Sequence, residues 1–348
     1  MVFDRPYESD YMMWTMNLLK KIVSRLVIGA VGSIALVLGI AMLLVFLPAP
    51  KIPEPKDVYG FKKLTQTMRA PNEAIRAPQY YRARDGTQLA YRFYDSKADR
   101  ILIFVHGSSY HGGGYDGLAK AISSRGFAKV YLPNLRGHYL SGPRSGDVVY
   151  IGQLEDDIAD LIGFARSHGQ NGPVILGGHS SGGGFAIRFA GGSHASLVSG
   201  YLLLTPVIPL APGFKRNSGW ATADVKRIIG LSILNSFGIS AFNGMPTIWF
   251  NKPQDLRDGA ETLVYSYRLN TSMHPRYKYE RDIAALGDHV LVVVGSDDQQ
   301  NSADGYAALM KPLDPKVLVL VLPGVNHLGI INDPTMLDAA GKWMSDLH

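Results

Sequence analysis

Cysteine is absent from all 348 residues of the chain. Disulfide bonds, thiolate metal sites and cysteine nucleophiles are therefore excluded. The chain also lacks a long run of lysine and arginine, although its formal net charge is +6, so we do not expect nucleic acid as a partner. Charged residues make up only 18% of the chain and hydrophobic residues 46%, with no internal repeat. This composition suits one large domain with an ample core, plus an accessory segment.

Charge is also absent from a stretch near the N-terminus, the 22 residues 26–47. As a helix this stretch would span about 30 Å, the thickness of the hydrocarbon layer of a membrane. A cleaved signal peptide is the alternative, but its apolar region is shorter, and Pro48 and Pro50 make a poor cleavage site. We therefore predict a polar tail over residues 1–25 and an uncleaved transmembrane signal anchor over residues 26–47.

Basic residues on the two sides of this apolar run predict its orientation. Three lie directly against its N-terminal side: Lys20, Lys21 and Arg25. Four lie on the other side: Lys51, Lys56, Lys62 and Lys63. The nearest charges favour an N-terminus inside the cell and a large domain outside, which in a bacterium is the periplasm. Residues 48–78 contain six prolines and predict a stiff linker between membrane and domain.

Short apolar runs alternate with helical stretches over the rest of the chain. We predict strands at residues 88–94, 101–105, 128–132, 174–176, 200–204, 290–294 and 317–321. This alternation predicts an α/β fold with a mostly parallel central sheet and helices on both faces. It is interrupted over residues 206–286, which are rich in aromatic residues and show no clear strand. We predict a core of residues 79–205 and 287–348, with residues 206–286 inserted as a lid.

Ser180 stands between the predicted strand 174–176 and a helix, within the sequence Gly178-His179-Ser180-Ser181-Gly182. This G-x-S-x-G pattern is typical of a nucleophile elbow, a sharp turn that exposes a serine. The turn brings positions 178 and 182 close together, so both need to lack a Cβ atom. The pattern alone is weak, because glycine and serine are common here, but the strand and helix around it support a nucleophilic serine.

A serine nucleophile needs a base, and the base needs an orienting carboxylate. In the elbow fold these follow the serine in the order acid, then histidine. Asp297 and Asp298 come directly after the strand 290–294, and His327 follows the strand 317–321. We predict His327 as the base and Asp298 as the acid, with Asp297 as the rival. This chemistry needs neither a metal nor a cofactor.

An oxyanion hole needs two backbone N–H groups. Ser181, at the start of the helix after the elbow, is expected to supply one. Ser108, in the loop after the strand 101–105, is expected to supply the other. The sequence His111-Gly112-Gly113-Gly114 also resembles the HGGG motif of some esterases, although it lies farther from the strand.

Together these stretches resemble the monoacylglycerol lipase, lysophospholipase and serine aminopeptidase-like branch of the α/β-hydrolases. His106 to Tyr115 resembles its HG-x-x-x-H-x-x-x-Y loop, and Leu135-Arg136-Gly137-His138 its R-G-H turn. Gly178 to Gly183 matches its GHS-x-GG elbow, Gly295 to Asp298 its acid loop, and Asn326-His327 its terminal histidine. The similarity covers about residues 80–345. Two departures, Asn134 for aspartate and Tyr139 for glycine, concern substrate fit rather than the triad.

The resemblance implies a serine hydrolase that cleaves carboxylic esters through an acyl-enzyme. The apolar anchor and the aromatic lid favour lipid-derived esters, such as monoacylglycerols or lysophospholipids. A serine aminopeptidase or amidase is the first alternative, and Asp224, Asp255, Asp258 and Glu261 are available to bind an α-ammonium group. An acyltransferase, or a non-catalytic binding protein tethered to the membrane, are others. The sequence does not predict the oligomeric state.

Overall fold

The computed structural model describes residues 7–57, 75–211 and 219–347. The chain divides into two compact units. One comprises Met1–Ala49 and Asp224–Phe242, and the other comprises Pro50–Ala223 and Asn243–His348. Much of the predicted linker, 58–74, lies outside the described residues, as does 212–218 of the predicted lid.

The α-helices and strands have the following bounds. The helices are α1 (Tyr7–Phe46), α3 (Asp116–Ser124), α4 (Gln153–Ser167), α5 (Ser181–Ala190), α6 (Val225–Ser236), α7 (Tyr267–Ser272), α8 (Tyr279–Ala284), α9 (Ala303–Met310) and α10 (Pro334–Ser345). The strands are β1 (Gln79–Arg82), β2 (Gln88–Tyr94), β3 (Ile101–Val105), β4 (Lys129–Pro133), β5 (Val174–His179), β6 (Gly200–Leu204), β7 (Ala221–Ala223), β8 (Pro246–Phe250), β9 (Val264–Ser266), β10 (Val290–Gly295) and β11 (Leu318–Leu322).

Eight strands form one sheet in the order β1-β2-β4-β3-β5-β6-β10-β11. The pairs from β4 to β11 are parallel, whereas β1–β2 and β2–β4 are antiparallel. The central strands β3, β5, β6 and β10 are buried along their whole length, as their continuous apolar sequences predict. The predicted mostly parallel sheet is therefore confirmed, and the sequence analysis missed only β1 at its edge.

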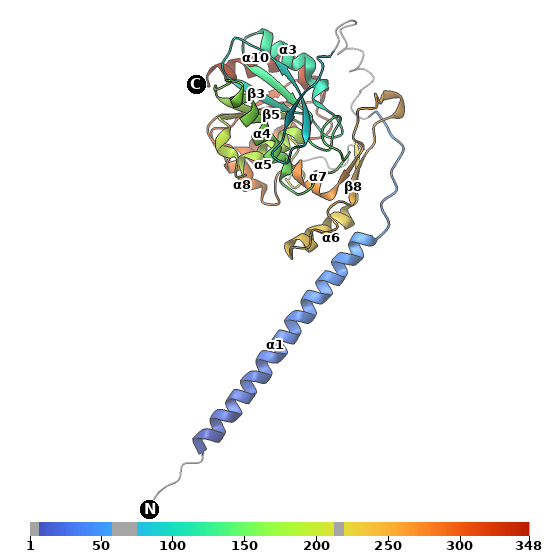
Figure 1. The fold of residues 1–348 in the computed structure, drawn as a ribbon, viewed down its shortest axis with the longest axis vertical. Coiled ribbons are helices and arrows are strands. Elements are labelled where there is room, and N and C mark those ends of the chain that lie inside the picture. Colours follow the sequence, from blue (N-terminus) through green and yellow to red (C-terminus); the bar gives the residue numbers. More distant parts are fainter. Residues whose placement is uncertain (1–6, 58–74, 212–218, 348) are drawn as a thin grey trace, which may run out of the picture. The chain divides into compact units, whose positions relative to one another are not determined.

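Helices cover both faces of this sheet (Figure 1). On one face, Leu118 and Ile122 of α3 join Met336 and Met344 of α10 in a common apolar cluster. On the other face, a second cluster contains apolar side chains of α4, α5 and α9, among them Phe185. The two clusters account for the three-layered arrangement that an α/β sequence predicts.

The predicted lid contains a second, antiparallel sheet in the order β7-β8-β9. The expectation that this stretch has no strand is therefore wrong. β7 and β9 have only three residues each, too short for a periodic pattern to be recognised. Within the same stretch, Asp224–Phe242 forms part of the other unit, with α1.

Helix α1 begins well before the uncharged run and ends at Phe46, one residue before the predicted end of the anchor. Its residues Tyr11–Phe46 are apolar and long enough to cross a membrane by length and composition, with a mean hydropathy of 2.6 over the most apolar window. At 1.5 Å per residue, a helix of 40 residues is about 60 Å long. That length exceeds the hydrocarbon layer, so only the apolar C-terminal half corresponds to the predicted span.

Helix α6 packs against the C-terminal end of α1. A Cβ atom on Gly230 would lie 2.6 Å from the carbonyl oxygen of Ala41, so the glycine permits this close approach. Arg227 Nε donates a hydrogen bond to the carbonyl oxygen of Val45 (3.0 Å), and Lys226 Nζ donates one to that of Pro48 (3.3 Å). Carbonyl groups at a helix C-terminus lack partners within the helix. The two basic side chains of α6 supply such partners at the end of α1.

Candidate active site

Ser180 lies in the sharp turn between β5 and α5. Its φ of 57° and ψ of −121° are unusual for a residue with a side chain. A Cβ atom on Gly178 would lie 2.3 Å from the backbone of Gly182, and one on Gly182 would lie 2.3 Å from the carbonyl oxygen of Val105. Only glycine fits at either position. The strained serine and the two close contacts are the geometry expected of a nucleophile elbow.

Three of the predicted residues form a chain of hydrogen bonds. His327 Nε2 lies 3.0 Å from Ser180 Oγ, and His327 Nδ1 lies 2.8 Å from Asp298 Oδ2. Asp298 and His327 are buried, and Ser180 is 9% exposed. The three residues follow β5, β10 and β11, so they meet at the carboxyl edge of the parallel sheet.

The surroundings of Asp298 stabilise its charged form. Its Oδ1 accepts hydrogen bonds from the N–H groups of Gln300 (2.7 Å) and Asn301 (2.9 Å), and its Oδ2 accepts one from Thr205 Oγ1. Burial by itself would raise the pKa of Asp298, but the hydrogen bond and charge of His327 outweigh it and lower the pKa to about 2. A permanently charged carboxylate at Nδ1 of His327 leaves Nε2 free to accept the Ser180 proton.

The rival acid, Asp297, has a different environment. It is exposed, and its carboxylate accepts a hydrogen bond from the neighbouring Ser296 hydroxyl (2.9 Å). Thr205, directly after β6, was not singled out from the sequence, although its position at a strand end was the available signal. The geometry therefore favours Asp298 and adds Thr205 as its support.

The loop after β3 runs beside the elbow. A Cβ atom on Gly107 would lie 3.4 Å from Ser180 Cβ and 3.3 Å from His179 Nδ1. Among the residues that the structure describes, no hydrogen bond engages the N–H group of Ser108 or that of Ser181. Both amides are therefore available to an oxyanion, as predicted for these two residues.

The glycines of the HGGG-like sequence have other roles. Gly112–Tyr115 form a short 3-10 helix, η1, and His111 Nδ1 accepts a hydrogen bond from Gly113 N (3.1 Å). The N–H of Gly112 donates to Asn134 Oδ1 (2.9 Å), and that of Gly114 donates to the carbonyl oxygen of His111 (3.2 Å). These amides are occupied, so this sequence is a structural turn here. Asn134, which stands where the resembling family has aspartate, is part of it.

A metal site is not evident near these residues. Across residues 7–57, 75–211 and 219–347, no group of three histidine, aspartate or glutamate side chains is arranged to hold an ion. The arrangement described above is instead suited to nucleophilic attack by a hydroxyl oxygen, with a histidine to carry its proton.

Comparison with known proteins agrees with this fold. The model of the Alpha/beta hydrolase family matches residues 102–339, more than half of the chain. The chain belongs to this family. The predicted α/β-hydrolase fold, with a mostly parallel central sheet, is thereby confirmed.

Individual relatives of this α/β hydrolase include lipases. It is 27% identical to a monoacylglycerol lipase of Mycolicibacterium smegmatis over 283 residues, which cover 74% of this chain and 93% of the relative. The fold is similar to that of a soluble variant of monoglyceride lipase from Saccharomyces cerevisiae (TM-score 0.55, 17% identity, covering 84% of this chain and 98% of that one). It is also similar to that of a membrane phospholipase A (TM-score 0.54, 15% identity, 94% and 98%). The relatives support hydrolase activity of the esterase or lipase type and the resemblance to the monoacylglycerol lipase branch.

Proposed function

We propose that this α/β hydrolase is a membrane-anchored serine hydrolase that cleaves lipid-derived carboxylic esters through an acyl-enzyme on Ser180. The observation that carries the proposal is the hydrogen-bonded chain from Ser180 through His327 to Asp298. A buried histidine between a hydroxyl and a carboxylate is the arrangement that activates a serine nucleophile.

The reaction follows from this geometry. Ser180 Oγ attacks the ester carbonyl carbon while its proton moves to His327 Nε2, and the carboxylate of Asp298 stabilises the resulting imidazolium. The N–H groups of Ser108 and Ser181 donate hydrogen bonds to the oxyanion. The tetrahedral intermediate collapses, the alcohol leaves with the proton from His327, and the acyl group remains on Ser180. A water molecule then repeats the sequence, releasing the carboxylic acid and restoring the serine.

Membrane anchoring is proposed through residues 26–47 of α1, with residues 79–205 and 287–348 as the hydrolase core and 206–286 as the insertion. The apolarity of α1 and its exposed hydrophobic side chains support an anchor. An anchored enzyme meets substrates that partition into the bilayer, which favours monoacylglycerols or lysophospholipids. The descriptions of the relatives, a monoacylglycerol lipase and a membrane phospholipase A, point in the same direction.

The peptidase alternative gains no support from the acidic residues that it would need. Asp224 caps α6 by accepting a hydrogen bond from the N–H of Arg227 (3.1 Å). Glu261 pairs with Lys252, and Asp258 accepts a hydrogen bond from the N–H of Ala260 (3.0 Å). These carboxylates stabilise local structure, so ester hydrolysis remains the favoured activity.

The test is labelling of the full chain, in detergent, with a fluorophosphonate that reacts with activated serines. We expect a single labelled peptide containing Ser180, and loss of labelling in Ser180→Ala. Ser181→Ala keeps the backbone N–H group and serves as the matched control. Hydrolysis should be faster for monoacylglycerols or lysophospholipids in mixed micelles than for short soluble esters or aminoacyl anilides. Folded protein that neither labels nor hydrolyses any ester, with lipid present, would refute the proposal.

We further propose that the hydrolase core lies outside the cytoplasm, as the charges beside the apolar run predict. The lack of native cysteine makes the test direct. Ser124→Cys, on an exposed helix end, should react with a membrane-impermeant maleimide in intact cells, while the unmodified chain should not. Reaction only after permeabilisation would contradict this orientation.

A further inference from the structure

The two amides that flank Ser108 are each held by a buried tyrosine. The N–H of Gly107 donates a hydrogen bond to the Tyr115 hydroxyl (2.9 Å), and the N–H of Ser109 donates one to the Tyr265 hydroxyl (2.6 Å). Ser109 has a φ of 65°, which a residue with a side chain adopts only when its surroundings hold it there. The loop that carries the predicted oxyanion donor is therefore fixed on both sides of Ser108.

The direction of each hydrogen bond around Tyr265 can be assigned. His138 Nδ1 lies 3.2 Å from the carbonyl oxygens of Leu135 and Arg136, which can only accept, so Nδ1 carries the proton. Burial lowers the pKa of His138 to about 4, so the ring is neutral at pH 7 and its Nε2 is an acceptor. Nε2 lies 2.5 Å from the Tyr265 hydroxyl. Tyr265 therefore donates its only hydroxyl proton to His138 and accepts from Ser109.

The same reasoning applies to Tyr115. His179 Nε2 lies 2.8 Å from the carbonyl oxygen of His327, so Nε2 carries the proton and Nδ1 accepts. Nδ1 lies 3.0 Å from the Tyr115 hydroxyl, which therefore donates to His179 and accepts from the N–H of Gly107. This relay ends on the backbone of His327, whose ring contacts Ser180. The two tyrosine–histidine relays are equivalent, but only the second one lies wholly within the predicted core.

Tyr265 belongs instead to β9 of the insertion. From the same segment, the N–H of Thr262 donates a hydrogen bond to the carbonyl oxygen of Ser109 (3.2 Å). Both backbone polar groups of Ser109 are thus satisfied by the insertion. A buried N–H group without a partner costs about 1–3 kcal/mol, so the loop conformation depends on these contacts.

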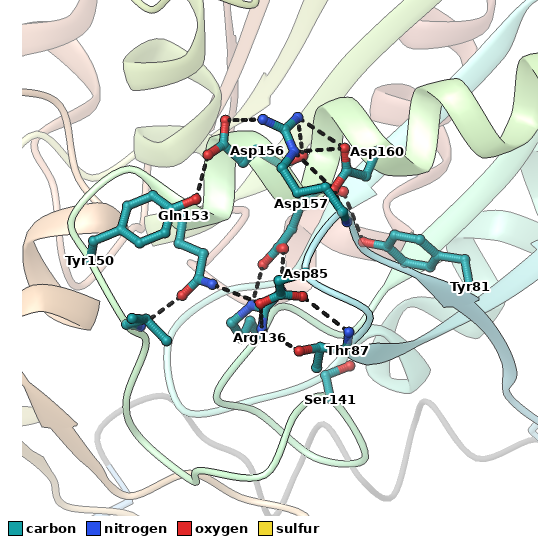
Figure 2. Close-up of polar contacts among 12 residues, drawn as sticks. Tyr81, Asp85, Thr87, Arg136, Ser141, Tyr150, Gln153, Asp156, Asp157 and Asp160 are labelled. Carbon is teal, nitrogen blue, oxygen red and sulfur yellow. Dashed lines mark hydrogen bonds and ion pairs between the residues drawn. The ribbon is translucent and has the colours of Figure 1, made fainter.

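The other end of the Tyr265 relay is firmly held (Figure 2). His138 lies in a turn that also contains Arg136, whose guanidinium makes two hydrogen bonds to Asp157 (2.8 and 2.7 Å). The same guanidinium bonds Asp85 (2.9 and 3.2 Å) and Thr87 (2.9 Å). Arg136 and Asp157 are both buried, so the pair fixes the turn and gives the histidine a defined position.

We propose that Tyr265 is a positioning residue for ester hydrolysis, which holds the Ser108 amide in line with the oxyanion by linking Ser109 to His138. The inference rests on the proposed function and adds a role for the insertion. Contacts of a group that positions an oxyanion donor matter most in the transition state, when the negative charge develops. Removal of the Tyr265 hydroxyl should therefore lower kcat and leave KM nearly unchanged.

The experiment compares Tyr265→Phe with Tyr81→Phe in the full chain in detergent. Tyr81 is the matched control, because it is equally buried and donates one hydrogen bond to a backbone carbonyl, that of Asp157 (2.9 Å), outside the loop. For Tyr265→Phe we expect kcat on a short ester to fall about 10-fold, with KM within twofold of the wild-type value. The inhibition constant of a trifluoromethyl ketone, whose adduct with serine carries an oxyanion, should rise by the same factor. Tyr81→Phe should change neither quantity, although both variants lose thermal stability.

The outcomes separate the inference from the function on which it depends. An active wild-type protein with unchanged kcat and inhibitor affinity in Tyr265→Phe would overturn the positioning role alone, whereas an inactive, folded wild-type protein would refute the proposed function as well. Should Tyr265→Phe fail to fold, the ring nitrogens of His138 can be observed in 15N-labelled wild-type protein. The relay requires the Nδ1–H tautomer, and the Nε2–H tautomer would overturn it.

Discussion

The two neighbouring aspartates after β10 have the same charge and sequence context but differ in what they contact. Asp298 is buried against His327 and Thr205, whereas Asp297 is exposed beside Ser296. Because a carboxylate acts on a serine nucleophile only through the histidine that it orients, the difference in contact should become a difference in rate.

We therefore expect Asp298→Asn to lower kcat for ester hydrolysis by about 10³ to 10⁴-fold. An amide in this position favours the wrong tautomer of His327 and cannot stabilise the imidazolium. Asp297→Asn, the matched control one residue earlier, should retain kcat within about twofold. Steady-state kinetics of the two purified variants decides between them, and equal losses in both would contradict the assignment of Asp298.

At the scale of residues, the sequence predicts what lies close to a motif. Ser180, Asp298 and His327 follow strands in the order that the elbow fold requires, so their meeting could be expected. Thr205 and Tyr265 could not be recognised in this way. Tyr265 contacts Ser109 from 156 residues away in the chain. No local pattern encodes such a contact, because it depends on how the insertion folds.

At the scale of elements, α1 and α6 form the contact that sequence periodicity did not predict. Each helix was recognisable only by its apolar residues, and an apolar helix carries no information on its partner. Phe46 at the end of α1 and Phe242 beyond α6 pack edge to face, with ring centroids 5.5 Å apart. This pair provides a direct measurement of the packing, since the chain has no other cysteine to interfere.

The double variant Phe46→Cys/Phe242→Cys should be cross-linked in high yield by a short bis-maleimide. The control pair, Leu36→Cys/Phe242→Cys, places the first cysteine ten residues earlier on α1, about 15 Å away along the helix, and should react poorly. Addition of Gly230→Leu should reduce the yield for the first pair, because the larger side chain separates the helices. The shift of the band on a non-reducing gel reports the yield. Equal yields for both pairs would contradict the packing.

The elements of the core were more predictable than those of the insertion. The buried strands β3, β5, β6 and β10 are continuous apolar runs, and such runs are typical of a parallel sheet. The strands of the smaller sheet are short, and their pairing is specified by partners rather than by composition. The early start of α1 shows the same limitation, because polar residues continue a helix whose apolar part alone is recognisable.

At the scale of the whole molecule, buried neutral histidines connect stability to pH. Burial lowers the pKa of His111 and His138 to about 4 and of His179 to about 3, and it lowers that of His106 well below its usual value. The unfolded chain binds protons at these residues as the pH falls below about 6.5, while the folded chain does not. Stability is therefore present above pH 6.5 and is lost as the pH falls towards the folded pKa values.

We expect the midpoint of thermal unfolding, followed by tryptophan fluorescence in a non-ionic detergent, to be lower at pH 5 than at pH 7. Each of these histidines should contribute a loss of about 2 kcal/mol at pH 5. His111→Asn keeps an acceptor for the Gly113 amide but does not titrate, so the difference between the two pH values should become smaller in this variant. Identical midpoints at the two pH values would contradict the role of the histidines.

The division of the insertion between two units has a consequence for any attempt to recombine this chain. The polypeptide leaves the hydrolase unit after Ala223, contributes α6 to the unit of α1, and returns at Asn243. The segment that carries Tyr265 is therefore not an exchangeable cassette, since a graft from a relative without an N-terminal helix would leave α1 without its partner. Conversely, a protease that cut within residues 51–57 would produce two fragments that remain associated through α1 and α6, as in a split protein.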